Sequence, residues 1–309
     1  MRAKLASAVA ALTLCVTLLS GCGPMANNDS SRIVVTTNIL GDIVGAIVGD
    51  EADVAVLMKP NADPHSFAIS AQEAHALQTA NLVIFNGLRL EEGVLHHVEA
   101  ASREGVPTFE VGAAVDPIEY TSGDTAGQAD PHFWTDPTRV VRAVERITDQ
   151  VIEHLPHVDA NTLRQRAASY AKELTALDAL MEQLFQAIPE TKRKLITNHH
   201  VFAYLAQRYG FTVMGAIVPS GTTLASPSAS DLASLVGAIS DNGISTIFVD
   251  TSQPDRLARV LADSAGIDVD IRSLYSESLG GPGSPADTYL NMMRFNASQI
   301  SDGLRAAAR

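Results

Sequence analysis

Cysteine is nearly absent from this chain of 309 residues, which contains only Cys15 and Cys22. We expect Cys15 to be lost with an N-terminal signal, so that the mature chain retains Cys22 alone. A single cysteine excludes an internal disulfide and a metal site built from several thiolates. Any metal site in the folded part must therefore use imidazole and oxygen ligands.

Long apolar runs are also scarce, and the most apolar one lies at the N-terminus. Leu5–Leu19 follows the basic residues Arg2 and Lys4 and is too short to span a bilayer as a mature helix. These features are typical of a signal peptide, which we assign to residues 1–21.

The signal ends in Leu19-Ser20-Gly21-Cys22, which is typical of a bacterial lipobox. We therefore expect Cys22 to become a lipid-modified first residue; a plain secretory signal cleaved near the same place is the alternative. Residues 22–31 are polar and lack a hydrophobic period, so they are predicted to form a lipid-anchored tether.

Basic residues are few, with 22 Lys and Arg against 35 Asp and Glu and a formal net charge of −13. Loss of Arg2 and Lys4 with the signal makes the charge −15. Such a chain lacks the basic face that nucleic acid requires, whereas it is compatible with attracting cations. The remaining length of about 280 residues exceeds the usual size of a single core, which favours two domains.

From Arg32 onward, short apolar runs rich in β-branched residues alternate with segments of helical spacing. This alternation predicts an α/β fold with two lobes, each a mostly four-stranded parallel sheet covered by helices. The expected strands are Ile33–Thr37, Asp53–Met58, Leu82–Phe85, Thr108–Val111, Lys194–Thr197, Phe211–Ile217, Thr246–Val249 and Val269–Arg272. The expected helices, apart from the long one described next, are Leu40–Val48, Ser70–Ala80, Glu91–Arg103, Thr138–His154, His200–Tyr209, Ser230–Asn242, Pro254–Ala265 and Pro285–Ala308.

One helix stands out by its length. From about Asp159 to Ile188, apolar residues recur at alternating steps of four and three, which predicts a continuous helix of about 45 Å. We interpret residues 159–189 as a rigid connector between an N-terminal lobe, 32–158, and a C-terminal lobe, 190–309. An ordinary packing helix within one lobe is the alternative.

The tripeptide Asp-Pro-His occurs twice, at residues 63–65 and 130–132. Because proline restricts its own φ and the conformation of the residue before it, each copy presents its imidazole from a stiff, non-helical backbone. A polar turn uses the same residues, so one copy alone is weak evidence for a metal ligand.

The positions of these histidines in the predicted fold strengthen the metal hypothesis. His65 and His132 follow the second and fourth expected strands, while His199 and Glu277 follow strands beyond the long helix. Ligands of open α/β sheets bind outside the carboxyl ends of the strands, so these four side chains are candidates to meet between the lobes. Five further histidines lie on expected helices or at their ends and are expected to be solvated surface residues; they are His75, His96, His97, His154 and His157.

Three imidazoles and one carboxylate suit Zn²⁺, and also Mn²⁺ if the carboxylate binds through both oxygens. Asp63 and Asp130 are expected to orient the adjacent histidines by hydrogen bonding, or to cap their loops, rather than to bind metal themselves.

Several motifs together resemble one family, the cluster A-I (cluster 9) solute-binding lipoproteins of bacterial zinc/manganese ABC importers. They are Asp63-Pro64-His65-Ser66-Phe67, Asn86-Gly87-Leu88-Arg89-Leu90-Glu91, Asp130-Pro131-His132-Phe133-Trp134, Thr197-Asn198-His199-His200-Val201-Phe202, Leu274-Tyr275-Ser276-Glu277-Ser278-Leu279 and Ala286-Asp287-Thr288-Tyr289. The resemblance implies two lobes joined by a long helix and one metal ion, Zn²⁺ or Mn²⁺, between them. It implies delivery of that metal to an ABC permease and its ATPase by a monomer anchored outside the cytoplasmic membrane. The implied ligands are His65, His132, His199 and the carboxylate in the motif that contains Glu277.

The chain departs from the family pattern in three places. His200 stands where the family usually has Asp, so it is a candidate outer partner of the site or a competing ligand. Glu277 stands where the family usually has Asp, and its extra methylene makes a water molecule the alternative fourth ligand. Residues 116–131 have no histidine before the second ligand, unlike the histidine-rich loop of many zinc importers.

Two other functions remain as alternatives. A secreted zinc metallohydrolase would use three His ligands and a bound water, with Glu277 as general base. The chain lacks the His-Glu-x-x-His helix of one large hydrolase class. A purely adhesive surface lipoprotein would make no use of the converging histidines. We favour a metal-binding protein without turnover, and zinc over manganese because nitrogen ligands predominate.

Overall fold

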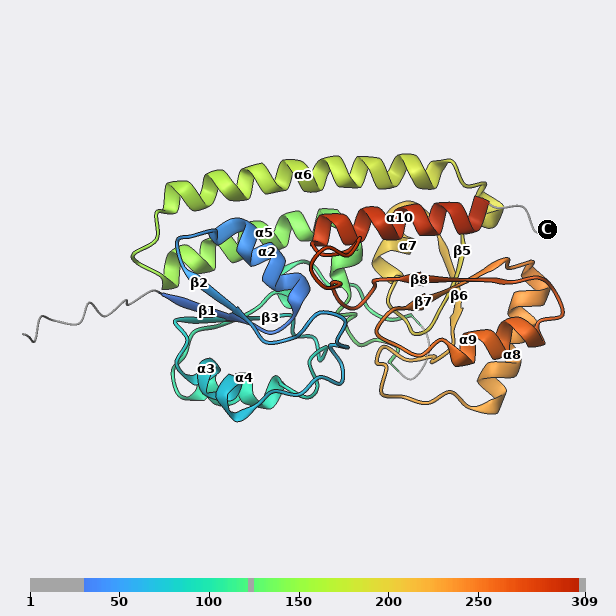
Figure 1. The fold of residues 1–309 in the computed structure, drawn as a ribbon, viewed down its shortest axis with the longest axis horizontal. Coiled ribbons are helices and arrows are strands. Elements are labelled where there is room, and N and C mark those ends of the chain that lie inside the picture. Colours follow the sequence, from blue (N-terminus) through green and yellow to red (C-terminus); the bar gives the residue numbers. More distant parts are fainter. Residues whose placement is uncertain (1–30, 122–124, 306–309) are drawn as a thin grey trace, which may run out of the picture. The chain divides into compact units, whose positions relative to one another are not determined.

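In the part of the chain that the structure describes, eight short strands form two separate parallel sheets of four strands each (Figure 1). The first sheet has the order β2-β1-β3-β4 and the second the equivalent order β6-β5-β7-β8. This arrangement confirms the predicted α/β fold with two four-stranded parallel sheets. The strands are β1 (Arg32–Val35), β2 (Asp53–Val56), β3 (Leu82–Phe85), β4 (Thr108–Glu110), β5 (Lys194–Thr197), β6 (Thr212–Ala216), β7 (Thr246–Asp250) and β8 (Asp270–Leu274).

This computed structural model describes residues 31–121 and 125–305. The predicted signal peptide, Cys22 and residues 22–30 of the predicted tether lie outside the described residues. From Ser31 onward the chain forms one compact unit. Below, the first lobe means the described residues before 159 and the second lobe those after 189. No helix in the described ranges has both the length and the apolar character needed to cross a membrane.

Helices cover both sheets, and their starts follow local hydrogen bonding. They are α2 (Asn38–Val48), α3 (Ala71–Gln78), α4 (Leu95–Arg103), α5 (Pro137–His154), α6 (Ala160–Gln186), α7 (Ala203–Tyr209), α8 (Ala229–Asn242), α9 (Arg256–Ser264) and α10 (Tyr289–Arg305), with short 3₁₀ turns at Gly112–Ala114, Phe133–Thr135 and Glu190–Lys192. Ser70 and Ser228 form the capping boxes at the starts of α3 and α8. Each serine accepts a backbone N–H that the first helical turn leaves unpaired.

Three predicted helices begin three or four residues later than their apolar spacing indicates. The expected start at Glu91 is wrong, and α4 begins at Leu95, because the Glu91 carboxylate accepts the backbone N–H groups of Asn86 and Gly87. The expected start at His200 is also wrong, because the His200 N–H donates to Ser220 O and α7 begins at Ala203. The start expected at Pro285 lies at Tyr289, whose N–H donates to Asp42.

The long helix α6 packs against elements of both lobes. Asp159 caps it by accepting the N–H groups of Asn161 and Thr162. Its buried face contacts α2 and α5 of the first lobe and α10 of the second (Figure 1). At 1.5 Å per residue, its 27 residues extend about 40 Å. The predicted length and apolar face are present; the buried residues are Leu163, Ala167, Tyr170, Leu174, Leu177, Met181 and Phe185.

One hydrophobic cluster continues from the first lobe into the second. It includes Ile33 and Phe133 from the first lobe, Leu177 of α6, and Tyr204 and Tyr289 from the second. Smaller clusters fill the space between each sheet and its outer helices. Because protein interiors are close-packed, a continuous core resists large rotation of one lobe against the other. The loops at the carboxyl ends of the strands are thereby kept close together.

Candidate metal centre

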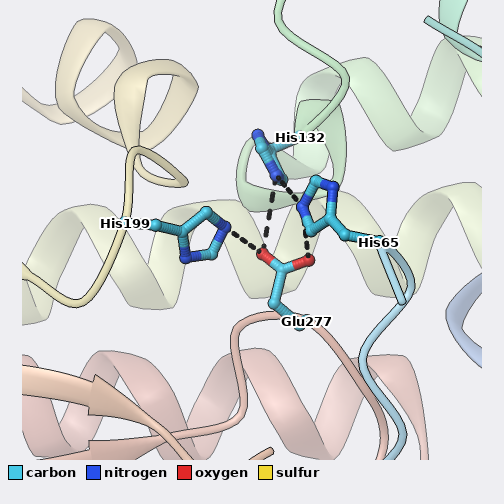
Figure 2. A group of neighbouring side chains, drawn as sticks. All are labelled: His65, His132, His199 and Glu277. Carbon is cyan, nitrogen blue, oxygen red and sulfur yellow. Dashed lines mark hydrogen bonds and ion pairs between the residues drawn. The ribbon is translucent and has the colours of Figure 1, made fainter. Parts of the chain in front are cut away.

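Four polar side chains from distant parts of the chain converge between the two sheets. His65 follows β2, His132 lies before α5, His199 follows β5 and Glu277 follows β8. One potential ligand atom from each lies within 4.8 Å of the others. Figure 2 shows the three imidazoles directed toward the Glu277 carboxylate. The structure thus brings together all four residues that the sequence nominated as ligands.

The distances between these atoms suit a small cation. His132 Nε2 lies 3.4 Å from His65 Nε2, and Glu277 Oε1 lies 3.1 Å from His199 Nε2 and 3.6 Å from His132 Nε2. Neighbouring ligands of a tetrahedral Zn²⁺ with bonds of 2.0–2.1 Å are about 3.3 Å apart. The second carboxylate oxygen, Oε2, lies 3.7 Å from His65 Nε2. Both oxygens of Glu277 therefore face the imidazoles.

Burial makes this cluster costly unless something binds there. The four side chains are at most 1% exposed. Four of their atoms have no hydrogen-bond partner: His65 Nδ1, His199 Nε2 and both Glu277 oxygens. An unpaired buried polar group costs about 1–3 kcal/mol, and more when charged. A cation bound between the imidazoles and the carboxylate would satisfy the atoms of His199 and Glu277.

The ring of His132 is fixed by the Asp130 carboxylate. Asp130 Oδ1 lies 2.7 Å from His132 Nδ1 and also accepts the His132 backbone N–H at 2.9 Å. A proton on Nδ1 leaves Nε2 with its lone pair directed at the cluster. Tyr120 OH lies 3.2 Å from the same Nδ1, and Tyr204 OH donates to Asp130 O. The expected orienting role of Asp130 agrees with this geometry.

The loop that carries His132 is supported by hydrogen bonds that begin at the buried carboxylate of Glu91. Glu91 accepts hydrogen bonds from Thr36 Oγ1 at 2.6 Å and from the N–H groups of Asn86 and Gly87. The Asn86 side chain in turn donates to Pro131 O at 3.1 Å. This chain of hydrogen bonds joins β1 and β3 to the second Asp-Pro-His and so supports its backbone.

His65 is presented by a turn that Asp63 closes. Asp63 Oδ1 accepts the His65 N–H at 2.9 Å, and Oδ2 accepts the Ser66 hydroxyl at 2.9 Å. Side-chain hydrogen bonds of this type are a known way in which Asp stabilises non-helical loops. Asp63 therefore stabilises the turn and does not face the cluster as a ligand.

Glu277 is positioned by Asp250, which the sequence analysis did not identify. Asp250 Oδ2, at the end of β7, accepts the N–H groups of Ser276 and Glu277 and the Ser276 hydroxyl at 2.6–3.0 Å. The same loop is tied to the first lobe, since Trp134 Nε1 donates to Ser276 O. Asn38 also donates to Ser278 Oγ. These fixed contacts allow the longer Glu side chain to reach the imidazoles.

The roles of Asp250, Asn86, Glu91 and Tyr120 depend on the folded chain. Asn86 and Glu91 lie in one of the family motifs, but the motif does not reveal what they bind. Asp250 is an acidic residue at the carboxyl end of a predicted strand, the position that drew attention to the other site residues. His200, by contrast, is half-buried and does not belong to the convergent four-residue set found among the described residues. The His200 backbone N–H donates to Ser220 O in the turn between β5 and α7. Because its imidazole is not in the convergent set, the structure does not support His200 as a competing ligand.

The electrostatics of the cluster favour neutral imidazoles in the first lobe. Burial, together with the neighbouring imidazoles, holds the pKa of His65 and His132 well below the ordinary value. Burial also disfavours a charged His199, but the Glu277 carboxylate outweighs it and raises the His199 pKa. Burial raises the pKa of Glu277 to about 7. Neutral imidazoles keep the lone pairs that a metal requires.

A family model described as "Zinc-uptake complex component A periplasmic" matches residues 33–303. The chain belongs to this family. The match covers both sheets, the long helix and the loops of all four convergent residues. It confirms the resemblance found in the sequence motifs and excludes neither zinc nor another divalent metal.

Curated relatives of this ZnuA family member are named for different metals. The manganese-binding lipoprotein MntA of Bacillus subtilis is 30% identical over 306 residues, which cover 96% of this chain and 98% of MntA. The iron-binding protein YfeA of Yersinia pestis is 29% identical over 291 residues, 93% of this chain and 92% of YfeA. The chain is therefore a metal-binding substrate-binding protein of the ABC-transporter type, a class without enzymatic turnover.

A solved structure has the same fold. The periplasmic zinc-binding protein TroA of Treponema pallidum superposes with a TM-score of 0.83 at 27% sequence identity, covering 90% of this chain and 100% of that chain. This chain and TroA thus share the same α/β architecture.

Replacing Asp130 with asparagine should weaken zinc binding about 10- to 100-fold, because the amide no longer fixes the tautomer and orientation of His132. Competition with a fluorescent zinc chelator measures this change. Asp241→Asn, which alters an exposed residue of α8, is the matched control and should leave affinity unchanged. Equal affinities of the Asp130 variant and the control would show that Asp130 does not orient the ligand.

Proposed function

We propose that the chain captures a divalent transition metal outside the cytoplasm and delivers it to the permease of an ABC importer, and through it to the ATPase. His65, His132, His199 and Glu277 are the proposed ligands. The observation that carries the proposal is the convergence of three imidazoles and a carboxylate that are at most 1% exposed and include four atoms without a hydrogen-bond partner. Such a closed set suits retention of a cargo ion.

The same geometry counts against the metallohydrolase alternative. A hydrolytic zinc site needs an open coordination position, a water and a general base beside it. Here Glu277 lies among the imidazole nitrogens, 3.1 Å from His199 Nε2, rather than beside an open position. We therefore propose that the chain is not an enzyme and that no substrate other than the metal enters this site.

We propose zinc as the preferred cargo, with manganese next. Three nitrogen ligands and one carboxylate favour zinc, and the general affinity order of divalent metals also places Zn²⁺ above Mn²⁺. Manganese is the second candidate because both oxygens of Glu277 face the imidazoles, within 3.1–3.7 Å of their nitrogens. A bidentate carboxylate would supply the additional oxygen that a harder ion prefers.

The cellular setting of this proposal rests on the N-terminal sequence. Removal of residues 1–21 would leave Cys22 as a lipid-modified first residue on the outer face of the cytoplasmic membrane. Residues 22–31 would tether the folded unit near the permease. We propose that the protein acts there as a monomer, since the ligand set is complete within one chain.

Competition between metals tests the proposed cargo. The metal-stripped full chain, purified in detergent, should bind one Zn²⁺, and its affinity for Zn²⁺ should exceed that for Mn²⁺ by about 100-fold or more. Isothermal titration of each metal, with a chelator competitor for zinc, measures both affinities. Tighter binding of Mn²⁺ would overturn the zinc assignment, and no binding of either metal would overturn the proposed function.

A further inference from the structure

The Asp63 carboxylate also makes hydrogen bonds across the gap between the lobes. Its Oδ2 accepts the Thr223 hydroxyl at 2.6 Å and the Gln253 side-chain amide at 3.0 Å. Thr223 follows β6 and Gln253 follows β7, whereas Asp63 follows β2 of the first lobe. Hydrogen bonds to an ionised acceptor are stronger than those between neutral groups. One carboxylate thus joins three strand-end loops from two sheets.

These partners flank the strand that carries His199. The second sheet has the order β6-β5-β7-β8, so the strands before Thr223 and Gln253 lie on either side of β5. The ends of β5 and β7 are also joined directly, since Asn198 Oδ1 accepts the Asp250 N–H at 3.1 Å. A displacement of this sheet edge would therefore carry His199, Thr223 and Gln253 together.

Within the first lobe, Asp63 also forms a hydrogen bond with the backbone of His65. Its other oxygen, Oδ1, accepts the His65 N–H at 2.9 Å. The imidazole rings of His65 and His199 lie close together, with their centroids 5.5 Å apart. Separating these two imidazoles by moving the sheet edge would break the bonds from Asp63 to Thr223 and Gln253.

A groove beside these contacts is lined in part by His199. It has a volume of about 510 Å³ and is lined by His199, Thr223, Gln253, Val218, Leu257 and Val260, among others. Thr223 and Gln253 are half-buried, whereas His199 itself is fully buried. Thr223 and Gln253, which donate to Asp63, thus line the same groove as the proposed ligand His199.

We propose that Asp63, Thr223 and Gln253 form an inter-lobe latch that slows the loss of bound metal through this groove. Asp63 is a positioning residue in this role: it contacts no metal, but it holds the His65 loop against the sheet edge that carries His199. The latch rests on the proposed function, because it acts on the retention time of the metal captured by that site.

The test removes the second-lobe half of the latch and leaves the Asp63 turn intact. Thr223→Val combined with Gln253→Leu keeps side-chain size but abolishes both donors to Asp63. Zinc-loaded full chain is mixed with excess EDTA in a stopped-flow instrument, and the rate of zinc release is measured. Loss of two bonds to a carboxylate should accelerate release by about tenfold or more. Each single substitution should give an intermediate rate, which keeps the test valid if the double variant folds poorly.

Thr175→Val is the matched control. It makes the same Thr-to-Val change at an exposed position of α6, where the hydroxyl donates to Ala171 O, so release should stay within about twofold of the unsubstituted protein. Release at the unsubstituted rate in the double variant would overturn the latch, as would equal acceleration by Thr175→Val. A chain that binds no zinc at all would overturn the proposed function and the latch with it, whereas normal affinity with unaltered release would overturn the latch alone.

Discussion

Replacing His65 with alanine should lower zinc affinity by about 100- to 1,000-fold, and His199→Ala should have an effect of the same size. A structural zinc site of four ligands contributes about 10–16 kcal/mol, so one ligand accounts for a few kcal/mol. His65 belongs to the first lobe and His199 to the second. Comparable losses in both variants are expected only if one ion bridges the lobes.

Chelator competition on the metal-stripped variants measures these affinities. His75→Ala is the control, because His75 is an exposed histidine of α3. It should bind zinc as the unsubstituted chain does. Full affinity in either His65→Ala or His199→Ala would remove that residue from the proposed ligand set.

Replacing Glu277 with glutamine should have opposite effects on metal binding and on the stability of the metal-free protein. Zinc affinity should fall about 100-fold or more, because the amide is a far weaker ligand than the carboxylate. The metal-free protein should become more stable by about 1–3 kcal/mol at pH 8, since burial of the ionised carboxylate destabilises the folded state.

The pH dependence of that gain follows from the raised pKa. Burial raises the pKa of Glu277 from 4.5 to about 7, so ionisation lowers the stability of the folded state as the pH rises between these values. The advantage of glutamine should be small at pH 4 and complete at pH 8. Urea unfolding of the metal-stripped proteins at both pH values measures it.

Glu104→Gln, at an exposed site after α4, is the control and should change neither affinity nor stability. Unchanged zinc affinity in Glu277→Gln would favour water as the fourth ligand. Lower stability of the metal-free variant at pH 8 would contradict the claim that the carboxylate is poorly accommodated without a cation.

The strands were predictable because their signal is local. In β1, for example, Ile33, Val34 and Val35 form a short run that is buried on both faces of a parallel sheet. The face of α6 was predictable for the same reason, because its period of apolar residues can be read from one continuous stretch. Both predictions required no knowledge of distant contacts.

Helix starts were less predictable where a side chain is used elsewhere. Glu91 has good helix propensity, but its carboxylate binds the backbone of the loop before it, and α4 therefore begins at Leu95. Tyr289 starts α10 because Asp42, 247 residues away, accepts its N–H. Spacing along the sequence contains no information about such partners.

The candidate site was predictable because His65, His132, His199 and Glu277 all follow expected strands. The repeated tripeptide also drew attention to His65 and His132. The partners of the supporting residues were not predictable: Asp250 holds the Glu277 loop over 26–27 residues, and Asp63 reaches Thr223 over 160. Their roles depend on the packing of one lobe against the other.

The division of the site between the lobes also needed the structure. By chain order, His199 and Glu277 both come from the second lobe. The loop around Glu277 is nevertheless bound to both lobes, through Asp250 on one side and through Trp134 and Asn38 on the other. Glu277 is therefore held near the middle of the interface, whereas His65 and His199 lie on its two sides.

The location of the bound metal tests the central claim most directly. A crystal structure of the zinc-loaded protein, with anomalous diffraction measured at the zinc edge, locates the ion without reference to any assumed ligand. We predict one strong peak, about 2.0–2.1 Å from the Nε2 atoms of His65, His132 and His199 and bonded to Glu277. A principal zinc peak away from these four residues would contradict the account.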